Sequence, residues 1–427
     1  MGSVREGAAG SAPARSSLRQ RLAVLGPAFV AAIAYVDPGN VATNTAAGGR
    51  YGYLLVWVLV AANLMAGLVQ YLSAKLGVVT ARSLPEAVRE HTSAPVRLAY
   101  WAQAELIAAA TDLAEVVGGA LALQLLFGLP LLIGGVVTGF VATMLLLVQD
   151  RFGQHPFERV VVGFLGVITI GCVAGLFVTP PDPAATLAGL LPRFDGAGSL
   201  LLATGMLGAT VMPHAIYLHS ALSRDGGLAR YPGGLPGHGP QRRSLLGSTR
   251  IDVVCAMLVA GAVNLAMLLL AATALRGVGG VDSITGVHHA LGAVLGPGIA
   301  VLFAIGLLAS GFASTSVGCY AGSVVMAGLL QRRVPLLVRR LVTLAPALLV
   351  LGAGADPTAA LVVSQVVLSF GIPFALVPLV VLTSRRSVMG ADVNHRATTV
   401  VAAVVTALVV AVNITLVAMI AITGEVP

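Results

Sequence analysis

The residues best suited to chemistry stand in the first long apolar stretch, where Asp37-Pro38-Gly39-Asn40 interrupts side chains that suit lipid. Pro38 removes a backbone donor and Gly39 tolerates almost any backbone angle, so we expect the helix to break here and expose free carbonyl groups. A charge at membrane depth costs roughly 2.5 to 3.5 kcal/mol on insertion scales, so Asp37 needs a cation or a proton as its partner. The stretch therefore predicts one half of an ion site.

A second interruption, Met212-Pro213-His214, lies inside another apolar segment much later in the chain. Pro38 and Pro213 stand at corresponding points of two similar segments. A pair of proline-interrupted hydrophobic segments is typical of a transporter built from repeats, with its substrate near the middle of the bilayer. We therefore expect the two breaks to face each other.

Composition predicts the elements that hold these residues. The chain has 427 residues, of which 57% are hydrophobic and 10% charged, with many apolar runs of about twenty residues. We interpret it as an all-α, polytopic membrane protein, with no nucleic-acid function behind its net charge of +8. Eleven transmembrane helices are expected at 22–45, 53–75, 98–126, 130–149, 157–179, 198–223, 251–275, 298–330, 335–353, 357–383 and 397–423.

The distribution of charge predicts the orientation. An odd number of spans puts the termini on opposite sides, and all but three of the 25 Lys and Arg residues fall inside if the N-terminus is cytoplasmic. This asymmetry favours a cytoplasmic N-terminus and an external C-terminus in the cell membrane. Residues 1–21 would form a cytoplasmic tail, and no cleavable signal peptide is evident. The three exceptions are Arg50, Arg193 and Arg276.

The spans also predict an internal repeat. Residues 22–179 hold five spans and residues 198–383 hold five more, while 397–423 is the eleventh. Because five is odd, the second set enters the membrane from the opposite side and the repeats are inverted. The sequence has no Walker-type motif, no His-Glu-x-x-His and no serine elbow, so we expect neither ATP hydrolysis nor another enzymatic activity.

The two breaks together offer a set of metal ligands. Each first half-helix would present its partly negative C-terminal end, and the carbonyls of Ala34 and Ala209 become free by the same geometry. With Asp37, Asn40 and Met212 they would form a mostly oxygen cage with one thioether. Such a cage suits Mn²⁺ or Fe²⁺ better than Ca²⁺ or Mg²⁺, because hard ions gain nothing from sulfur. The alternative is that Met212 only fills the core.

The third span carries three further acids, Glu105, Asp112 and Glu115, in one stripe of a helix. Buried carboxylates this dense indicate a proton or ion route. Arg339 and Arg340, near the inner end of the ninth span, are the expected partners, although they could instead be anchors at the membrane surface. The spacing leaves open which acid pairs with which arginine.

Two histidines, His214 and His219, follow Pro213 towards the inner end of the sixth span. A neutral imidazole could ligate a metal or carry a proton, and a purely structural histidine is an equal alternative. Thr111, beside Asp112, and Asn264 are expected to form hydrogen bonds between helices.

Through Asp37-Pro38-Gly39-Asn40 and Met212-Pro213-His214 the chain resembles the natural resistance-associated macrophage proteins, among them the bacterial proton-coupled manganese transporters. The resemblance extends more weakly over nearly the whole chain. It implies the fold of the sodium-coupled leucine transporter and a metal held by Asp37, Asn40, Met212 and the two carbonyls. It further implies that Gln365 joins the metal in some states and that Gln70 lies near it. Ala215 departs from the asparagine common in that family.

The resemblance also implies proton conduction to the cytoplasm through the acid–arginine network, and proton handling by the histidines. We thus expect a secondary active transporter that imports Mn²⁺, with Fe²⁺ and similar ions, coupled to protons by alternating access. Asp37 would be both ligand and proton acceptor. No cofactor is expected, and the chain should work as a monomer in the lipid bilayer. The alternatives are an ion-coupled carrier of an organic solute on the same fold and an uncoupled metal channel.

Overall fold

The computed structural model describes residues 26–152, 154–231, 234–237, 239–281, 283–332 and 334–423. The predicted cytoplasmic tail at 1–21 and the first four residues of the first predicted span lie outside these residues. The secondary structure of the described residues is helical throughout, as predicted. Apolar helices suit a membrane because they satisfy their own backbone hydrogen bonds.

The first half of the chain supplies five predicted spans, of which the first is divided. Its elements are α2 (Pro27–Ile33), the 3₁₀ turn η1 (Ala34–Val36), α3 (Pro38–Tyr51), α4 (Val56–Thr80), α5 (Leu84–Glu90), α6 (Ala94–Phe127), α7 (Leu131–Phe152) and α8 (Gln154–Val178). The short helix α5 begins at a capping box formed by Ser83 and Glu86.

The second half again has a divided first long segment, followed by further long helices. Its elements are α9 (Pro183–Ala188), α10 (Gly196–Thr210), α11 (Pro213–Arg230), α12 (Pro240–Ala274), α13 (Ile284–Leu295), α14 (Pro297–Leu330), α15 (Leu336–Gly352), α16 (Pro357–Thr383), α17 (Arg386–Met389), η2 (Gly390–Asp392) and α18 (Arg396–Thr423).

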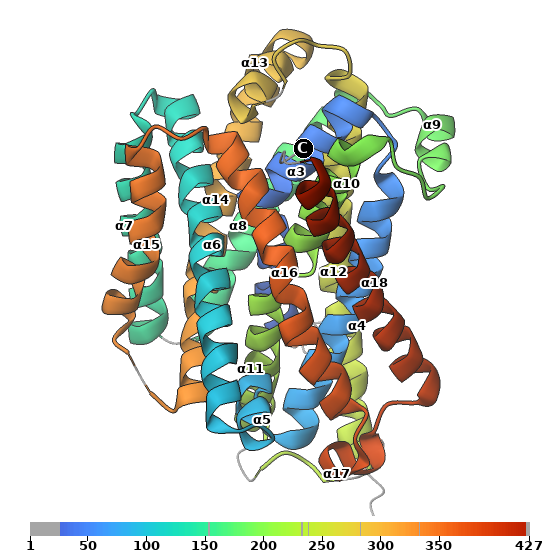
Figure 1. Ribbon diagram of the computed structural model, residues 1–427. Helices are drawn as coiled ribbons and strands as arrows, with labels where there is room; N and C mark the ends of the chain where they lie inside the picture. The colour runs from blue at the N-terminus through green and yellow to red at the C-terminus, as the bar shows by residue number, and fades with distance from the viewer. Residues whose placement is uncertain are drawn as a thin grey trace, which may run out of the picture.

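The divided segments lie in the interior of the bundle, surrounded by the long helices (Figure 1). α6 packs along α14, α7 and α15 lie together on one flank, and α18 covers α16 and α10 on the other (Figure 1). The whole window of the α10–α11 segment that is apolar enough to span a membrane is buried within the protein. The breaks therefore face other helices and are shielded from lipid.

The long helices confirm a polytopic membrane protein, while the number eleven stays a prediction. In the described part of the chain, seven helices are long and apolar enough to cross a bilayer, namely α4, α6, α10 with α11, α12, α14, α16 and α18. The predicted spans 1, 4 and 5 contain shorter apolar helices there, and α15 has 17 residues.

Four predicted boundaries were wrong by more than about four residues. α3 runs to Tyr51, past the predicted end at 45, and α4 runs to Thr80, past the predicted end at 75. The two largest errors lie between the sixth and seventh predicted spans. α11 continues to Arg230, beyond the predicted end at 223, and α12 begins at Pro240, before the predicted start at 251. The added turns carry arginines, which suit water. The apolar pattern marks where a helix leaves the lipid, whereas backbone hydrogen bonds continue the helix past that level.

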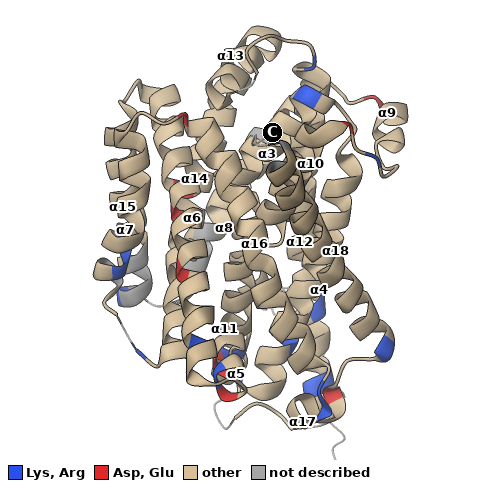
Figure 2. Ribbon diagram, in the orientation of Figure 1, with Lys and Arg blue, Asp and Glu red and all other residues tan. Residues whose placement is uncertain are grey.

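Charged residues separate between the two ends of the bundle. Lys and Arg gather at the end that carries α5 and α17, and few lie at the end that carries α9 and α13 (Figure 2). At the first end, Arg224 forms ion pairs with Glu86 and Asp225, Arg242 lies 3.2 Å from Asp392, and Lys75 donates to Asn394.

Candidate metal-binding site

The first break differs in one respect from its sequence prediction, since Pro38 and Gly39 start a helix. Asp37 has an extended backbone (φ −81°, ψ 169°) and caps α3, whose first residue is Pro38. Proline suits that position because the first amide of a helix has no intrahelical acceptor. Gly39 has no positive φ. Asp37 therefore lies between the end of the preceding half-helix and the partly positive start of α3. The sequence predicted only the first of these two neighbours.

The second break repeats this local geometry. α10 ends at Thr210, Met212 has an extended backbone (φ −71°, ψ 124°), and Pro213 is the first residue of α11. Met212 and Ala209 are fully buried, and so is Ala34 at the first break, with 1% of its surface exposed. The prediction that both segments break at a proline is confirmed.

Hydrogen bonds join the two breaks to each other and to α16. The side-chain amide of Asn40 donates to the Asp37 carboxylate at 2.6 Å and to the Ala209 carbonyl at 2.9 Å. The backbone N–H of Asn40 donates to the same carboxylate at 2.7 Å. From α16, the Gln365 amide donates to the other Asp37 oxygen at 3.3 Å. Asp37 is thus joined to three other predicted site residues, directly to Asn40 and Gln365 and through the Asn40 amide to Ala209.

Two oxygens in this cluster have no hydrogen-bond partner. Both Asn40 Oδ1 and Gln365 Oε1 are buried without a donor. Buried polar atoms are nearly always paired, so each such acceptor needs an explanation. Within the described residues, no three His, Cys, Asp or Glu side chains come close enough to hold a metal ion. The Asp37 cluster, which draws on amide and carbonyl oxygens, is therefore the candidate cation site.

Some carbonyls freed at the first break are bound by side chains of other helices. Asn264 of α12 donates to the Tyr35 carbonyl at 2.6 Å and accepts from Asn44 of α3 at 2.8 Å. Ser310 of α14 donates to the Val36 carbonyl at 2.6 Å. The predicted interhelical role of Asn264 is confirmed, while Ser310 and Asn44 were missed. Their signal was a polar side chain within an apolar segment.

Two acids of α6 form ion pairs with the arginines of α15. Arg340 donates to Asp112 at 2.7 Å, and Arg339 donates to Glu105 at 3.1 Å. This pairing answers the question left open by the spacing. Arg339 and Arg340 are buried, with 4% and 1% of their surfaces exposed, respectively, so they are not anchors at the membrane surface.

The stripe continues from this pair towards Asp37. Glu115 lies one turn beyond Asp112, is buried, and faces Gly318 of α14, where a Cβ would lie 3.3 Å from each carboxylate oxygen. One turn further, Gly118 packs against the ring of Pro38. Beside the stripe, the Thr111 hydroxyl lies 3.4 Å from His214 Nδ1.

His219 belongs to a separate cluster. Its Nδ1 lies 2.6 Å from the side-chain oxygen of Gln70, and the Gln70 amide donates to the hydroxyl of Tyr35. These contacts link the first, second and sixth predicted spans below the break. Among the described residues, Gln70 therefore contacts Tyr35, two residues before Asp37, and does not contact Asp37 itself.

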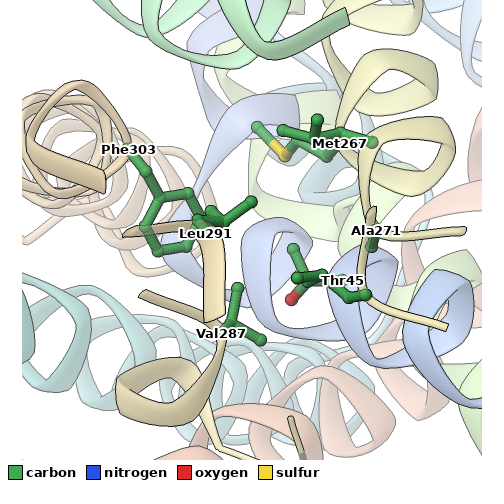
Figure 3. Close-up of a pocket in the computed structure, with 8 residues that line it drawn as sticks. Thr45, Met267, Ala271, Val287, Leu291 and Phe303 are labelled. Atoms are coloured by element: carbon green, nitrogen blue, oxygen red, sulfur yellow. The ribbon is translucent and has the colours of Figure 1, made fainter. Parts of the chain in front are cut away.

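A small pocket lies on the other side of the first break. Val287 and Leu291 of α13 face Thr45 of α3 across it (Figure 3). The remaining lining is Met267, Leu270, Ala271, Leu275 and Phe303. Thr45 supplies the one hydroxyl group in the lining of the pocket, and this hydroxyl donates to the Val41 carbonyl at 2.5 Å. A lining this apolar does not suit a metal ion.

Fold and site together define a polytopic helical membrane protein with two discontinuous helices that meet at a buried carboxylate, as in secondary transporters. Residues 28–419 match the family described as natural resistance-associated macrophage protein-like. The chain belongs to this family.

Relatives and solved structures agree with this assignment. The chain is 61% identical over 403 residues to the divalent metal cation transporter MntH of Mycobacterium tuberculosis (strain H37Rv), covering 94% of this chain and 93% of that protein. It is 45% identical over 401 residues to MntH of Bacillus subtilis (strain 168), covering 93% and 92%. These relatives are named as transporters and not as enzymes.

Among solved structures, the Eremococcus coleocola manganese transporter matches with a TM-score of 0.84 and 30% identity, covering 99% of this chain and 91% of that one. MhsT in complex with L-phenylalanine matches with a TM-score of 0.58 at 14% identity, covering 91% and 98%. This second likeness concerns the fold alone. It agrees with the expected fold of the sodium-coupled leucine transporter type.

Proposed function

We propose that this chain imports divalent transition-metal ions, Mn²⁺ first and Fe²⁺ and similar ions with it, coupled to protons by alternating access. The observation that carries the proposal is the fully buried Asp37 carboxylate, flanked by two amide oxygens without donors on Asn40 and Gln365. A cation would use all three. The names of the relatives, divalent metal cation transporter and manganese transporter, support the same substrate class.

In this proposal Asp37 supplies the charge, and the other ligands are neutral. Asn40 and Gln365 would turn their free oxygens to the ion, and the carbonyls of Ala34 and Ala209 would complete the oxygen set. In the present structure the Asn40 amide donates hydrogen bonds to Asp37 and to the Ala209 carbonyl. A bound cation would take the place of these donors. Metal entry would replace hydrogen bonds by coordination.

Met212 is the proposed source of selectivity. Its position at the start of α11 puts a thioether at the same break as the Ala209 carbonyl. Sulfur adds affinity for Mn²⁺, Fe²⁺ and softer ions, and adds little for Ca²⁺ or Mg²⁺. A ligand that hard ions cannot use discriminates against ions that are far more abundant.

The proposed proton route starts at Asp37, which an arriving cation would deprotonate. From there the stripe of Glu115 and Asp112 leads along α6 to Arg340, and Glu105 with Arg339 lies two turns further along. His214 touches this stripe through Thr111, at 3.4 Å. We assign His219 to the same function with Gln70 as its neighbour. The two arginines hold the acids in place and offset their charge.

The closed surroundings of the site support alternating access. Asp37, Asn40, Met212 and Gln365 have no exposed surface. An ion can reach them only after helices move, and a pore open at both ends would need an exposed path. In our proposal the inverted repeats at 22–179 and 198–383 provide the two alternative openings.

The proposed setting is the cell membrane, with residues 1–21 in the cytoplasm and the helix at 397–423 ending outside. The gathering of Lys and Arg at the α5 and α17 end supports this orientation. We propose that a single copy of the chain transports, because the candidate ligands all come from one chain.

Uptake by proteoliposomes tests the proposal directly. Purified protein would be reconstituted, and Mn²⁺ entry would be followed with and without an acidic exterior, with protein-free vesicles as the control. Proton-coupled import predicts entry that accelerates with the pH gradient and is accompanied by acidification of the lumen. Competition by Fe²⁺ and Cd²⁺, but not by Ca²⁺ or Mg²⁺, is also expected.

The other outcomes separate the alternatives. Mn²⁺ entry without proton movement would indicate an uncoupled channel. An organic solute that moves with an ion, in vesicles that exclude Mn²⁺, would indicate a solute carrier.

A further inference from the structure

Gln365 occupies a tight place between the two divided segments. α16 packs against both α3 and α10. The side chain of Gln365 lies directly over Gly39 of α3, and its backbone carbonyl lies against Gly208 of α10. Gly39 and Gly208 thus let α16 approach closely on two sides, at the level of Asp37.

The contact at Gly39 leaves no room for a side chain as long as Gln365 keeps its observed position. A Cβ built on Gly39 would overlap the amide group of Gln365 and lie 2.6 Å from its Cγ. The backbone of Gly39 does not itself require glycine, since it is the second residue of α3 and has no positive φ. Alanine is the better helix former at such a position. The structure therefore gives one reason for glycine at residue 39, which is the space that Gln365 occupies.

We propose that Gly39 is a positioning residue, which admits the Gln365 amide to Asp37 and so decides whether α16 contributes a ligand to the metal. This inference rests on the proposed function. Gly39 itself touches no ion. Its role is to permit the closed arrangement, in which the Gln365 amide lies 3.3 Å from Asp37. If α16 moves away from α3, a side chain at residue 39 would no longer overlap Gln365.

A mutant cycle tests the inference. Gly39→Ala should push Gln365 away and raise the KM for Mn²⁺ by about tenfold, as loss of a supporting group at a metal site usually does. Gln365→Ala should have a similar effect. Because the shorter side chain at residue 365 removes the overlap, the double variant should be no worse than Gln365→Ala alone. Interactions between residues in contact are non-additive in this way.

Gly49→Ala is the matched control on the same helix. A Cβ at Gly49 would make an ordinary contact, 3.5 Å from Val281 Cγ2. Its KM should match that of the unmodified protein. Losses that add up in the double variant would overturn the inference, and so would a Gly39→Ala protein with unchanged KM.

A metal-free measurement keeps this test independent of transport. Without metal, Gly39→Ala should lower the thermal unfolding midpoint, and adding Gln365→Ala should restore it to the Gln365→Ala value or above. If the unmodified protein fails to transport any metal, the proposed function fails, while the midpoints still show whether Gly39 positions Gln365. A midpoint that falls further in the double variant would overturn the positioning role.

Discussion

Asp37 is the only carboxylate among the proposed ligands, so the charge of the site depends on one residue. Asp37→Asn keeps the size of the side chain but removes the negative charge and the proton acceptor together. We expect metal uptake to be lost and Mn²⁺ affinity to fall by at least about tenfold. Calorimetric titration and liposome uptake would measure this. Asparagine preserves helix capping, so the variant should fold and insert normally. Near-normal uptake would contradict the assignment of Asp37.

Met212 is the proposed soft ligand, and its replacement should change selectivity more than activity. Met212→Ala removes sulfur but no charge, so Mn²⁺ and Cd²⁺ binding should weaken by about tenfold or less, while Ca²⁺ binding changes little. The ratio of Mn²⁺ to Ca²⁺ affinity, from competition titrations, is the quantity to measure. A second variant, Met257→Ala in α12, would show the effect of losing a buried methionine outside the two divided segments. An unchanged ratio in Met212→Ala would make Met212 a packing residue.

The divided helix depends on side chains from the helices around it. Asn264 bridges the two halves of the first segment, because it binds the Tyr35 carbonyl and the Asn44 amide. Asn264→Ala would leave both without their partner. An unsatisfied buried polar group costs about 1–3 kcal/mol, and two groups lose their partner, so the free energy of unfolding should fall by at least that amount.

Thr415→Ala is a suitable control for Asn264→Ala, since Thr415 is exposed and its hydroxyl bonds only within its own helix, at 2.9 Å from the Ala411 carbonyl. Detergent unfolding curves of both variants would measure the difference. Equal stability of the two would show that water replaces Asn264 at the break.

The pairing of α6 with α15 makes a prediction about coupling. Asp112 is outside the proposed ligand set and is held by Arg340 at 2.7 Å. Asp112→Asn should therefore make metal uptake insensitive to the pH gradient while Mn²⁺ binding survives. Parallel traces of luminal pH and Mn²⁺ entry would detect this separation.

Glu105→Gln provides a graded comparison for Asp112→Asn. The side chain of Glu105 is 23% exposed, against 4% for Asp112, so its carboxylate occupies a less buried position on the proposed route. We expect a smaller loss of coupling. If Asp112→Asn removed Mn²⁺ binding as well, Asp112 would have a structural role or belong to the metal site.

At the scale of the whole molecule, the separation of charge predicts the orientation. In cells, a membrane-impermeant maleimide should label Leu191→Cys, in the exposed segment after α9, and should not label Ser387→Cys in α17 until the membrane is permeabilised. The parent chain controls for the native cysteines, of which Cys319 is buried and Cys255 partly so. The reverse labelling pattern would invert the proposed topology and reverse the direction of transport.

The sequence by itself determined the class of protein and the position of both breaks. Apolar runs interrupted by Asp37-Pro38 and Met212-Pro213 depend on local chemistry, since proline lacks a backbone donor and a lone carboxylate is costly in lipid. These effects depend only on a few neighbouring residues, so they are the same in the sequence and in the folded chain. They also placed Asn40 and Ala209 correctly beside the breaks.

Tertiary structure alone decided the contacts between distant segments. Arg340 pairs with Asp112 and Arg339 with Glu105 because of how α15 lies against α6, a relation that residue spacing within one helix cannot fix. The same holds for Ser310 on the Val36 carbonyl and for Gln365 over Gly39. From the sequence, the conformational freedom of glycine explained its presence at residue 39, whereas the structure gives a different reason, which is packing. The approach of α16 fills the space that a side chain would need.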